Sequence, residues 1–260
     1  MHEQALALRR EIDDKVGAAF TLNNLGVVYF EQDRFAEAAK RYEESLQLCR
    51  DIGDRRGIIR ALHNLAIVKK EVGELNEARK ALEDSLALRK EIGDKRGRAV
   101  GLVELAFVGM QMGDIVSSKQ SAEEALSIAR ETKFRNAESQ VMYLLGDISF
   151  EQGDLAAARK NHETALAIRR EMREDRTILE SRVALANVAL AEGRATEAEM
   201  TVRELQTSVS NDPAMQATIE LLVARALLDQ KKIDGAAAAV KRAKALSAST
   251  QRNFLRTMSS

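Results

Sequence analysis

The sequence has no tryptophan, a single proline (Pro213) and a single cysteine (Cys49), and aromatic residues make up only 4% of it. One cysteine cannot form an internal disulfide, so a disulfide-stapled fold is excluded and a reducing compartment is expected. One proline in 260 residues leaves long stretches free to form uninterrupted helix. We therefore expect a cytoplasmic protein whose fold depends on the packing of helices.

An excess of charge and a long apolar run are also lacking. The chain carries 40 basic and 40 acidic residues, so it offers no electrostatic footprint for direct nucleic acid binding or for an anionic membrane. No apolar run approaches the ~18 residues that a membrane-spanning helix needs. The N-terminus also lacks the basic-then-apolar pattern of a signal peptide. We expect no membrane association.

What is present is a repeat with a period of 40 residues, best seen between Ala19 and Gly57. Small residues recur at this spacing in two series: Gly26, Ala66, Ala106, Gly146 and Ala186, and then Ala38, Ala78, Ser118, Ala158 and Ala198. A period of this length held over most of a chain is the signature of a solenoid. Small residues are needed where helix axes approach to about 8 Å.

Each repeat contains the pattern of two helices. Leu22, Leu25 and Tyr29 mark one face of a helix with a period of 3.6 residues. A glycine followed by an acidic residue, as in Gly73-Glu74, then ends that helix and can cap the next one. The fold class predicted is all-α, a right-handed α-solenoid of about six helical hairpins plus a leading single helix.

The expected units follow the repeat. They are the second helix of an incomplete repeat (1–13), six repeats (14–57, 58–97, 98–137, 138–177, 178–212 and 213–248) and a tail (249–260). In the leading helix the apolar face with Leu6 and Ile12 would lack one neighbour. Two explanations stay open: the chain is cut from a longer protein with a repeat missing upstream, or the half-repeat is a natural cap. The exposed end helices also offer a surface for a homodimer.

The lone cysteine fits the same register. Its counterparts one period away are Arg9 and Arg89, which indicates a position that tolerates solvent. We interpret Cys49 as a thiol without a functional role.

The residues Leu22, Leu25, Gly26, Tyr29 and Tyr42 resemble the short motif of the tetratricopeptide repeat (TPR) family, and the resemblance covers nearly the whole chain. The usual unit has about 34 residues. Here the period is 40, and the proline that normally ends the second helix is replaced. The replacing residues are Arg50, Lys90, Arg130 and Arg170. This long form is similar to the repeats of kinesin light chain-like adaptors and to C-terminal arrays of bacterial multidomain regulators.

The resemblance implies that the first helices line a concave groove that binds a peptide. The candidate groove residues are Asn23, Asn24, Phe30, Arg60, His63, Asn64, Phe107, Met110, Tyr143, Asp147, Phe150 and Asn187. Asparagine side chains both donate and accept hydrogen bonds, so they can pair with a peptide backbone. Aromatic and methionine side chains suit an apolar anchor. Arg60 together with Lys70 would favour an acidic segment. Packing between repeats is the alternative explanation for any one of these residues.

No catalytic, cofactor or metal site is predicted. The chain has no phosphate-binding loop, no Gly-x-Ser-x-Gly, no His-Glu-x-x-His and no cysteine cluster. We expect a non-enzymatic protein–protein interaction scaffold that binds a peptide or helix, as a fragment of a larger bacterial signalling or regulatory protein. The alternative is a ligand-sensing segment that controls an attached kinase, ATPase or DNA-binding domain.

Overall fold

The computed structural model describes residues 2–206, 209 and 212–258, with side chains up to residue 248. All regular structure in this part of the chain is α-helical: α1 (His2–Glu11), α2 (Lys15–Glu31), α3 (Phe35–Asp51), α4 (Arg55–Glu71), α5 (Leu75–Glu91), α6 (Lys95–Gln111), α7 (Ile115–Glu131), α8 (Arg135–Glu151), α9 (Leu155–Met172), α10 (Asp175–Ala191), α11 (Ala195–Gln206), α12 (Pro213–Asp229) and α13 (Ile233–Met258). The chain divides into two compact units, Met1–Leu144 (unit 1) and Leu145–Ser260 (unit 2), and the division falls inside α8. The predicted all-α solenoid class is confirmed.

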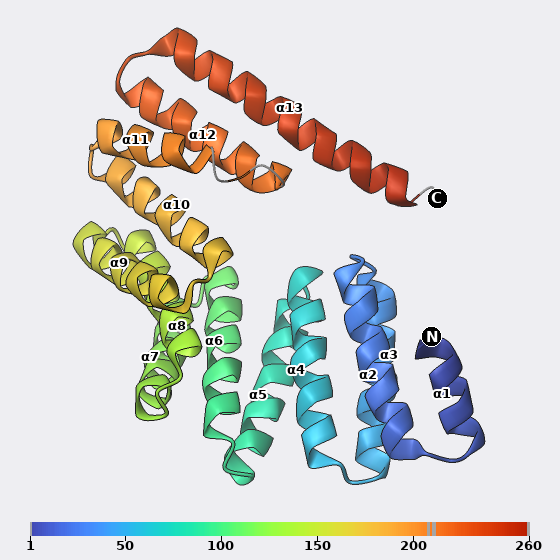
Figure 1. The fold of residues 1–260 in the computed structure, drawn as a ribbon. Coiled ribbons are helices and arrows are strands. Elements are labelled where there is room, and N and C mark those ends of the chain that lie inside the picture. Colours follow the sequence, from blue (N-terminus) through green and yellow to red (C-terminus); the bar gives the residue numbers. More distant parts are fainter. Residues whose placement is uncertain (1, 207–208, 210–211, 259–260) are drawn as a thin grey trace. The chain divides into compact units, whose positions relative to one another are not determined.

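In unit 1 the helices pack in consecutive pairs, α2 with α3, α4 with α5 and α6 with α7, and each pair contacts the next (Figure 1). The small residues of the repeat lie where the helices of a pair approach each other. A Cβ atom on Gly26 would lie 2.4 Å from Cε1 of Tyr42, so only glycine leaves room for this ring. One repeat later Ala66 and Leu82 occupy the same two positions, and both are buried. A larger side chain on the second helix is thus matched by a smaller residue on the first.

The turns after the helices use a left-handed backbone residue. Gly53, Gly73, Gly93 and Gly113 have φ values of 71°, 81°, 71° and 75°. Glycine adopts this conformation without steric cost, which explains its place in the repeat. Where the glycine is missing the chain keeps the same geometry, as at Lys133 with φ 51°. The conformation therefore belongs to the packing of the repeat rather than to glycine itself.

At six joints the acidic residue before a helix caps that helix. The Asp94 carboxylate accepts a hydrogen bond from the Gly97 N–H at 2.9 Å, and the same bond recurs at Asp14, Asp54, Asp114, Asp154 and Asp212. Such a bond satisfies one of the N–H groups that a helix leaves free at its start. The longer side chains of Glu74 and Glu174 make no cap bond, and Glu74 instead accepts a hydrogen bond from Lys69.

The expectation that Cys49 occupies a position that tolerates solvent is wrong: its side chain is fully buried, with 0% exposed. The thiol faces Gly57, where an added Cβ would lie 2.4 Å from Sγ. Arg89 uses the same register differently, because its guanidinium crosses to the Asp94 carboxylate at 2.7 Å. The Arg89 side chain also covers the equivalent glycine, Gly97, and is only 12% exposed, so the position is an interior one for either residue. Burial also raises the pKa of the Cys49 thiol.

The leading helix α1 packs its Leu6 against α2, and this side chain is only 3% exposed. Leu8, Ile12 and Val16 are 61%, 74% and 62% exposed. The corresponding side chains one repeat later, Leu48 and Ile52, are half-buried. The expected gap in the cover of the leading helix is therefore present at Ile12, while Leu6 belongs to the core.

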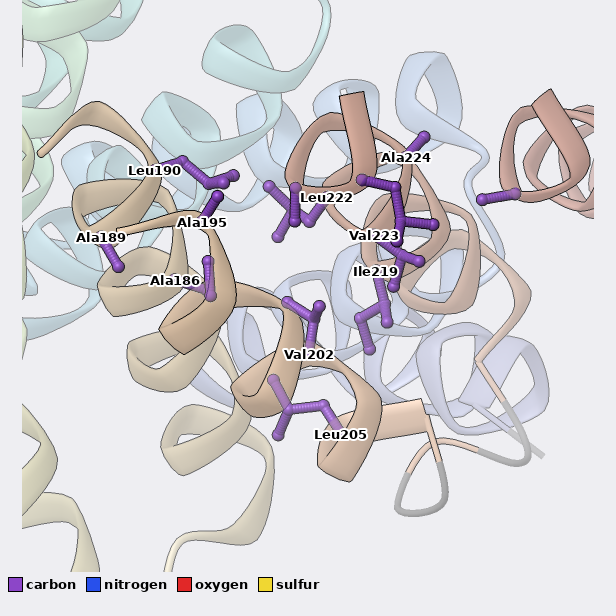
Figure 2. Close-up of a cluster of buried hydrophobic side chains, with 14 of the residues drawn as sticks. Ala186, Ala189, Leu190, Ala195, Val202, Leu205, Ile219, Leu222, Val223 and Ala224 are labelled. Carbon is purple, nitrogen blue, oxygen red and sulfur yellow. The ribbon is translucent and has the colours of Figure 1, made fainter. Parts of the chain in front are cut away.

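Unit 2 has its own core where α10, α11 and α12 meet (Figure 2). Leu205, Ile219 and Val223 are fully buried there. Pro213 occupies the first turn of α12 behind its cap Asp212, as the sequence predicted; Asn211 lies outside the described residues. Helix α13 continues to Met258, so the backbone of residues 249–258 is helical, and residues 207–208, 210–211 and 259–260 lie outside the described part.

Candidate functional site

The first helices of unit 1 bring the predicted binding residues onto neighbouring elements. Helix α2 contacts α4, and α4 contacts α6. Positions 40 residues apart therefore form columns that run from one first helix to the next. We name this surface the first-helix face: Phe20, Asn24, Val27, Phe30, Arg60, His63, Asn64, Ile67, Lys70, Glu104, Phe107 and Met110.

One column of this face is apolar. Val27, Ile67 and Phe107 occupy equivalent positions on α2, α4 and α6, and each is partly exposed. Phe20 on α2 is 47% exposed. Apolar side chains that stay accessible in an otherwise packed array can supply contact area to a partner. The column therefore extends over the first helices of three successive repeats.

The amide column beside it is partly occupied by a contact within the protein. Asn64 donates a hydrogen bond from Nδ2 to Oδ1 of Asn23 at 3.1 Å, and Asn23 is only 3% exposed. Asn24 is half-buried, and no hydrogen bond to its amide is found among the described residues. Asn24 and the remaining hydrogen-bonding atoms of Asn64 can therefore meet a partner, whereas Asn23 acts by fixing Asn64.

The cationic character expected of this face is weaker than the sequence indicated. Lys70 donates to Glu104 at 2.9 Å, and the two side chains are 16% and 24% exposed, so its charge is neutralised within the face. Arg60 stacks its guanidinium over the Phe20 ring, 5.3 Å from the centroid. The Nε atom of Arg60 is buried and has no hydrogen-bond partner among the described residues. Arg60 thus remains as the cation of the face, and Lys70 does not.

His63 lies between these groups on α4. Burial lowers its pKa, which the nearby Glu104 opposes and Arg89 and Lys70 support. The imidazole is therefore neutral near pH 7 and its Nδ1 is buried without a hydrogen-bond partner in the described part of the chain. A neutral imidazole in this position acts as a packing and hydrogen-bonding group, since it carries no charge to attract a ligand.

The remaining predicted residues lie on α8 and α10. Tyr143 belongs to unit 1 by the division of the chain, while Asp147, Phe150 and Asn187 belong to unit 2. In unit 2 the Asp147 Oδ1 atom lies 3.5 Å from Nε2 of His162. Burial raises the pKa of Asp147 to about 7 and lowers the pKa of His162 to about 4.

This pairing was missed by the sequence analysis, which assigned no role to His162. The available signal was Gly146, which stands where Ala66 and Ala106 stand in other repeats. A Cβ atom on Gly146 would lie 2.5 Å from Cε1 of His162, so the glycine marks the position of the imidazole.

Within the described residues, no group of three or more His, Cys, Asp or Glu side chains is arranged to hold a metal ion. None of the helices in the described part of the chain combines the length and apolarity needed to cross a membrane. The arrangement on the first-helix face is one of apolar contacts and neutral hydrogen-bonding groups.

Two family models match the chain. The tetratricopeptide repeat model matches residues 1–51 and 18–91, and the model of the MalT-like TPR region matches residues 61–258. Neither model describes a catalytic family. No curated protein matches the sequence.

Solved structures show the same fold. A signal transduction ATPase with numerous domains (STAND) that has a tetratricopeptide repeat sensor, from Pyrococcus horikoshii, is 16% identical with a TM-score of 0.75 over 98% of this chain. The chain spans 41% of the length of that protein. RapI in its apo form is 12% identical with a TM-score of 0.74, covering 98% of this chain and 90% of RapI. A protein from Podosopora anserina described as a kinesin light chain is 21% identical with a TM-score of 0.60, covering 75% and 97%.

Proposed function

Because the chain belongs to the family of the MalT-like TPR region, we propose that it is a non-enzymatic scaffold whose first-helix face in unit 1 binds a peptide or helix of a protein partner. The observation that carries this proposal is the column of Val27, Ile67 and Phe107, which stays partly exposed across three neighbouring helices. The flanking amides of Asn24 and Asn64 can pair with polar backbone groups of the bound segment.

The chemistry of the face defines the partner more closely. With Lys70 held by Glu104, the remaining cation is Arg60, which is already stacked on Phe20. A segment with apolar anchors and at most one acidic residue suits this surface better than a strongly acidic one. The anchors would meet the apolar column, and the acidic residue would meet Arg60.

The proposal is tested with a peptide selected from a random displayed library against the whole protein. Its affinity is then measured by calorimetry for the wild type and for Ile67→Lys. We expect Ile67→Lys to weaken binding at least about tenfold, because it places a charge where an apolar anchor docks. Ala87→Lys on the exposed surface of α5 is the matched control and should bind like the wild type.

Circular dichroism of both variants must show unchanged helicity. Wild-type affinity in Ile67→Lys would refute the first-helix face of unit 1 as the binding surface.

A ligand-sensing segment in a larger regulator is the second candidate. It is supported by the similarity to the MalT-like region and to a STAND protein with a repeat sensor. A small molecule that raises the melting temperature in the absence of any peptide would favour this candidate, since only a ligand of the folded state stabilises it.

A further inference from the structure

Two cavities occur at the same place in the repeat. A cavity of about 610 Å³ in unit 1 is formed by the end of α1, the start of α2 and the second half of α3. A cavity of about 390 Å³ in unit 2 is formed by the end of α11, the start of α12 and the middle of α13. The second is lined by Gln206, Gln216, Ile219, Glu220, Arg242, Ala245 and Leu246. Because both cavities lie at the same place in the repeat, the residues that line them can be compared position by position.

The comparison shows that Glu220 replaces a core leucine. Leu22 lies eight residues after the capping aspartate Asp14, and Glu220 lies eight residues after the capping aspartate Asp212. The position is occupied by a buried apolar residue in four successive repeats: Leu22, Leu62, Leu102 and Met142, which are 2%, 4%, 6% and 7% exposed. Glu220 is buried to a similar degree, with 9% exposed.

The Glu220 carboxylate is held by two side chains. Its Oε1 accepts hydrogen bonds from Gln206 Nε2 at 2.9 Å and Arg242 Nε at 3.0 Å, and its Oε2 accepts from Arg242 Nη2 at 2.9 Å. A buried carboxylate, even when it is paired, contributes no more stability than a well-packed apolar side chain, because the carboxylate loses its water. Four other repeats solve the same packing task with leucine or methionine, whereas the repeat directly before this one has Arg182 there, paired with Glu204. In that pair the acidic side chain is the exposed member, with Glu204 66% exposed, whereas Glu220 is the buried member of its pair. Packing alone therefore gives no reason for a buried carboxylate at this position.

The two charges of the pair differ in their access to solvent. The Glu220 side chain is 11% exposed and lies at the floor, whereas the Arg242 side chain is 51% exposed and lies at the rim. A cation that enters the cavity can take the place of Arg242, which then returns to water. An anion would draw Arg242 away and leave Glu220 buried without a partner, which is costly. The site therefore discriminates in favour of cations.

We propose that this cavity in unit 2, the Glu220 pocket, binds a small organic monocation, a primary amine on an apolar body. The ammonium group would replace Arg242 on Glu220, and the apolar body would lie against Ile219, Ala245 and Leu246. Ile219 belongs to the core cluster shared by α10, α11 and α12, so this wall is fixed by the packing of unit 2 (Figure 2). The volume lies within the range of small-molecule sites. The Glu220 pocket goes beyond the proposed peptide surface and is independent of it, because it uses other residues in the other unit.

The test uses n-hexylammonium as the probe on the whole protein, with binding measured by calorimetry. We expect saturable binding of this probe and no binding of n-hexanol or hexanoate at the same concentrations. Glu220→Gln, which keeps the shape and removes the charge, should weaken binding at least about tenfold through loss of a charge-assisted hydrogen bond. Arg242→Ala should bind the probe more tightly than the wild type, because its competitor for the carboxylate is gone.

The matched control is the pair Arg182–Glu204, which occupies the equivalent positions one repeat earlier, with Glu204 66% exposed. Glu204→Gln should leave probe binding unchanged. If Arg242→Ala is too unstable for calorimetry, the probe should raise its melting temperature by more than that of the wild type. Equal affinity of the wild type and Glu220→Gln, or absence of saturable binding in both the wild type and Arg242→Ala, would overturn the proposal.

Discussion

The size complementarity between Gly26 and Tyr42 can be tested by replacing these two residues with the pair found one repeat later. The change is Gly26→Ala combined with Tyr42→Leu, which reproduces Ala66 and Leu82 within the first hairpin. The Cβ that Gly26→Ala introduces would lie 2.4 Å from Cε1 of the Tyr42 ring, far inside contact distance. With leucine at position 42 that obstruction is removed. The two changes should therefore compensate each other.

The magnitudes follow from the packing. Gly26→Ala alone gains about 0.5–1 kcal/mol of helix propensity and loses about 1–3 kcal/mol by overpacking, so a net loss of about 1 kcal/mol is expected. Tyr42→Leu alone shrinks a side chain that is only 3% exposed, and the space left beside Gly26 should cost about 2 kcal/mol. In the double variant the new methyl group fills part of that space. We expect a loss of less than about 1 kcal/mol, and so a coupling energy of about 2 kcal/mol.

The assay is urea unfolding followed by far-UV circular dichroism, with all four proteins measured side by side. Repeat arrays can unfold in stages, so hydrogen exchange of the amides in α2 and α3 should be compared as a local measure of the same effect. As a control, Gly26→Ala combined with Val202→Ala in unit 2 pairs two changes in different hairpins and should be additive. Additivity of Gly26→Ala and Tyr42→Leu to within about 0.5 kcal/mol would refute the size-matching argument.

Two other predictions concern the turns and the pH dependence of unit 2. Lys133→Gly should raise the free energy of unfolding by about 1 kcal/mol, because the left-handed backbone of Lys133 costs a residue with a side chain about 1–2 kcal/mol. Gly113→Ala should lower the free energy of unfolding by a similar amount in the same denaturation experiment. Unchanged stability in both variants would contradict the argument for the turns. Burial raises the pKa of Asp147 from 3.8 to about 7, so the folded state binds more protons than the unfolded state between these pH values. The stabilisation that protonated Asp147 provides is therefore complete below pH 3.8 and is lost as the pH rises to about 7. The difference in unfolding free energy between the wild type and Asp147→Asn should therefore fall over this window. Burial lowers the pKa of His162 to about 4, so its own contribution rises with pH between about 4 and 6.5 and opposes that of Asp147; a flat difference between the wild type and Asp147→Asn would refute the raised pKa.

The fold could be predicted because its determinants are local and repeated. The spacing of small residues gives the helix pairing, and the glycine–acid step gives the turn and the cap. Both can be recognised without knowing which side chain meets which. A turn that lacks the glycine still follows the repeat: Lys133 keeps the left-handed turn geometry, because the neighbouring helices impose it.

The details of the candidate site could be predicted only in part. The repeat register places Asn64 and Lys70 on one face, but it does not tell that Asn64 bonds to Asn23 or that Lys70 pairs with Glu104. Such bonds join different helices and depend on side-chain rotamers, which a periodic pattern does not encode. Cys49 illustrates the same limit, since the arginines in its register suggest exposure although Cys49 and Arg89 both lie over the glycine that begins the next helix.

The order of the helix contacts has a consequence for how the protein is made. Within each unit, the contacts described for each helix are with its nearest neighbours or next-nearest neighbours along the chain. Contacts between segments close in sequence cost little loop-closure entropy, and such chains fold fast. A hairpin can therefore complete its core while residues further along are still being added by the ribosome. Synthesis and folding can proceed in the same direction and in the same steps, one repeat at a time.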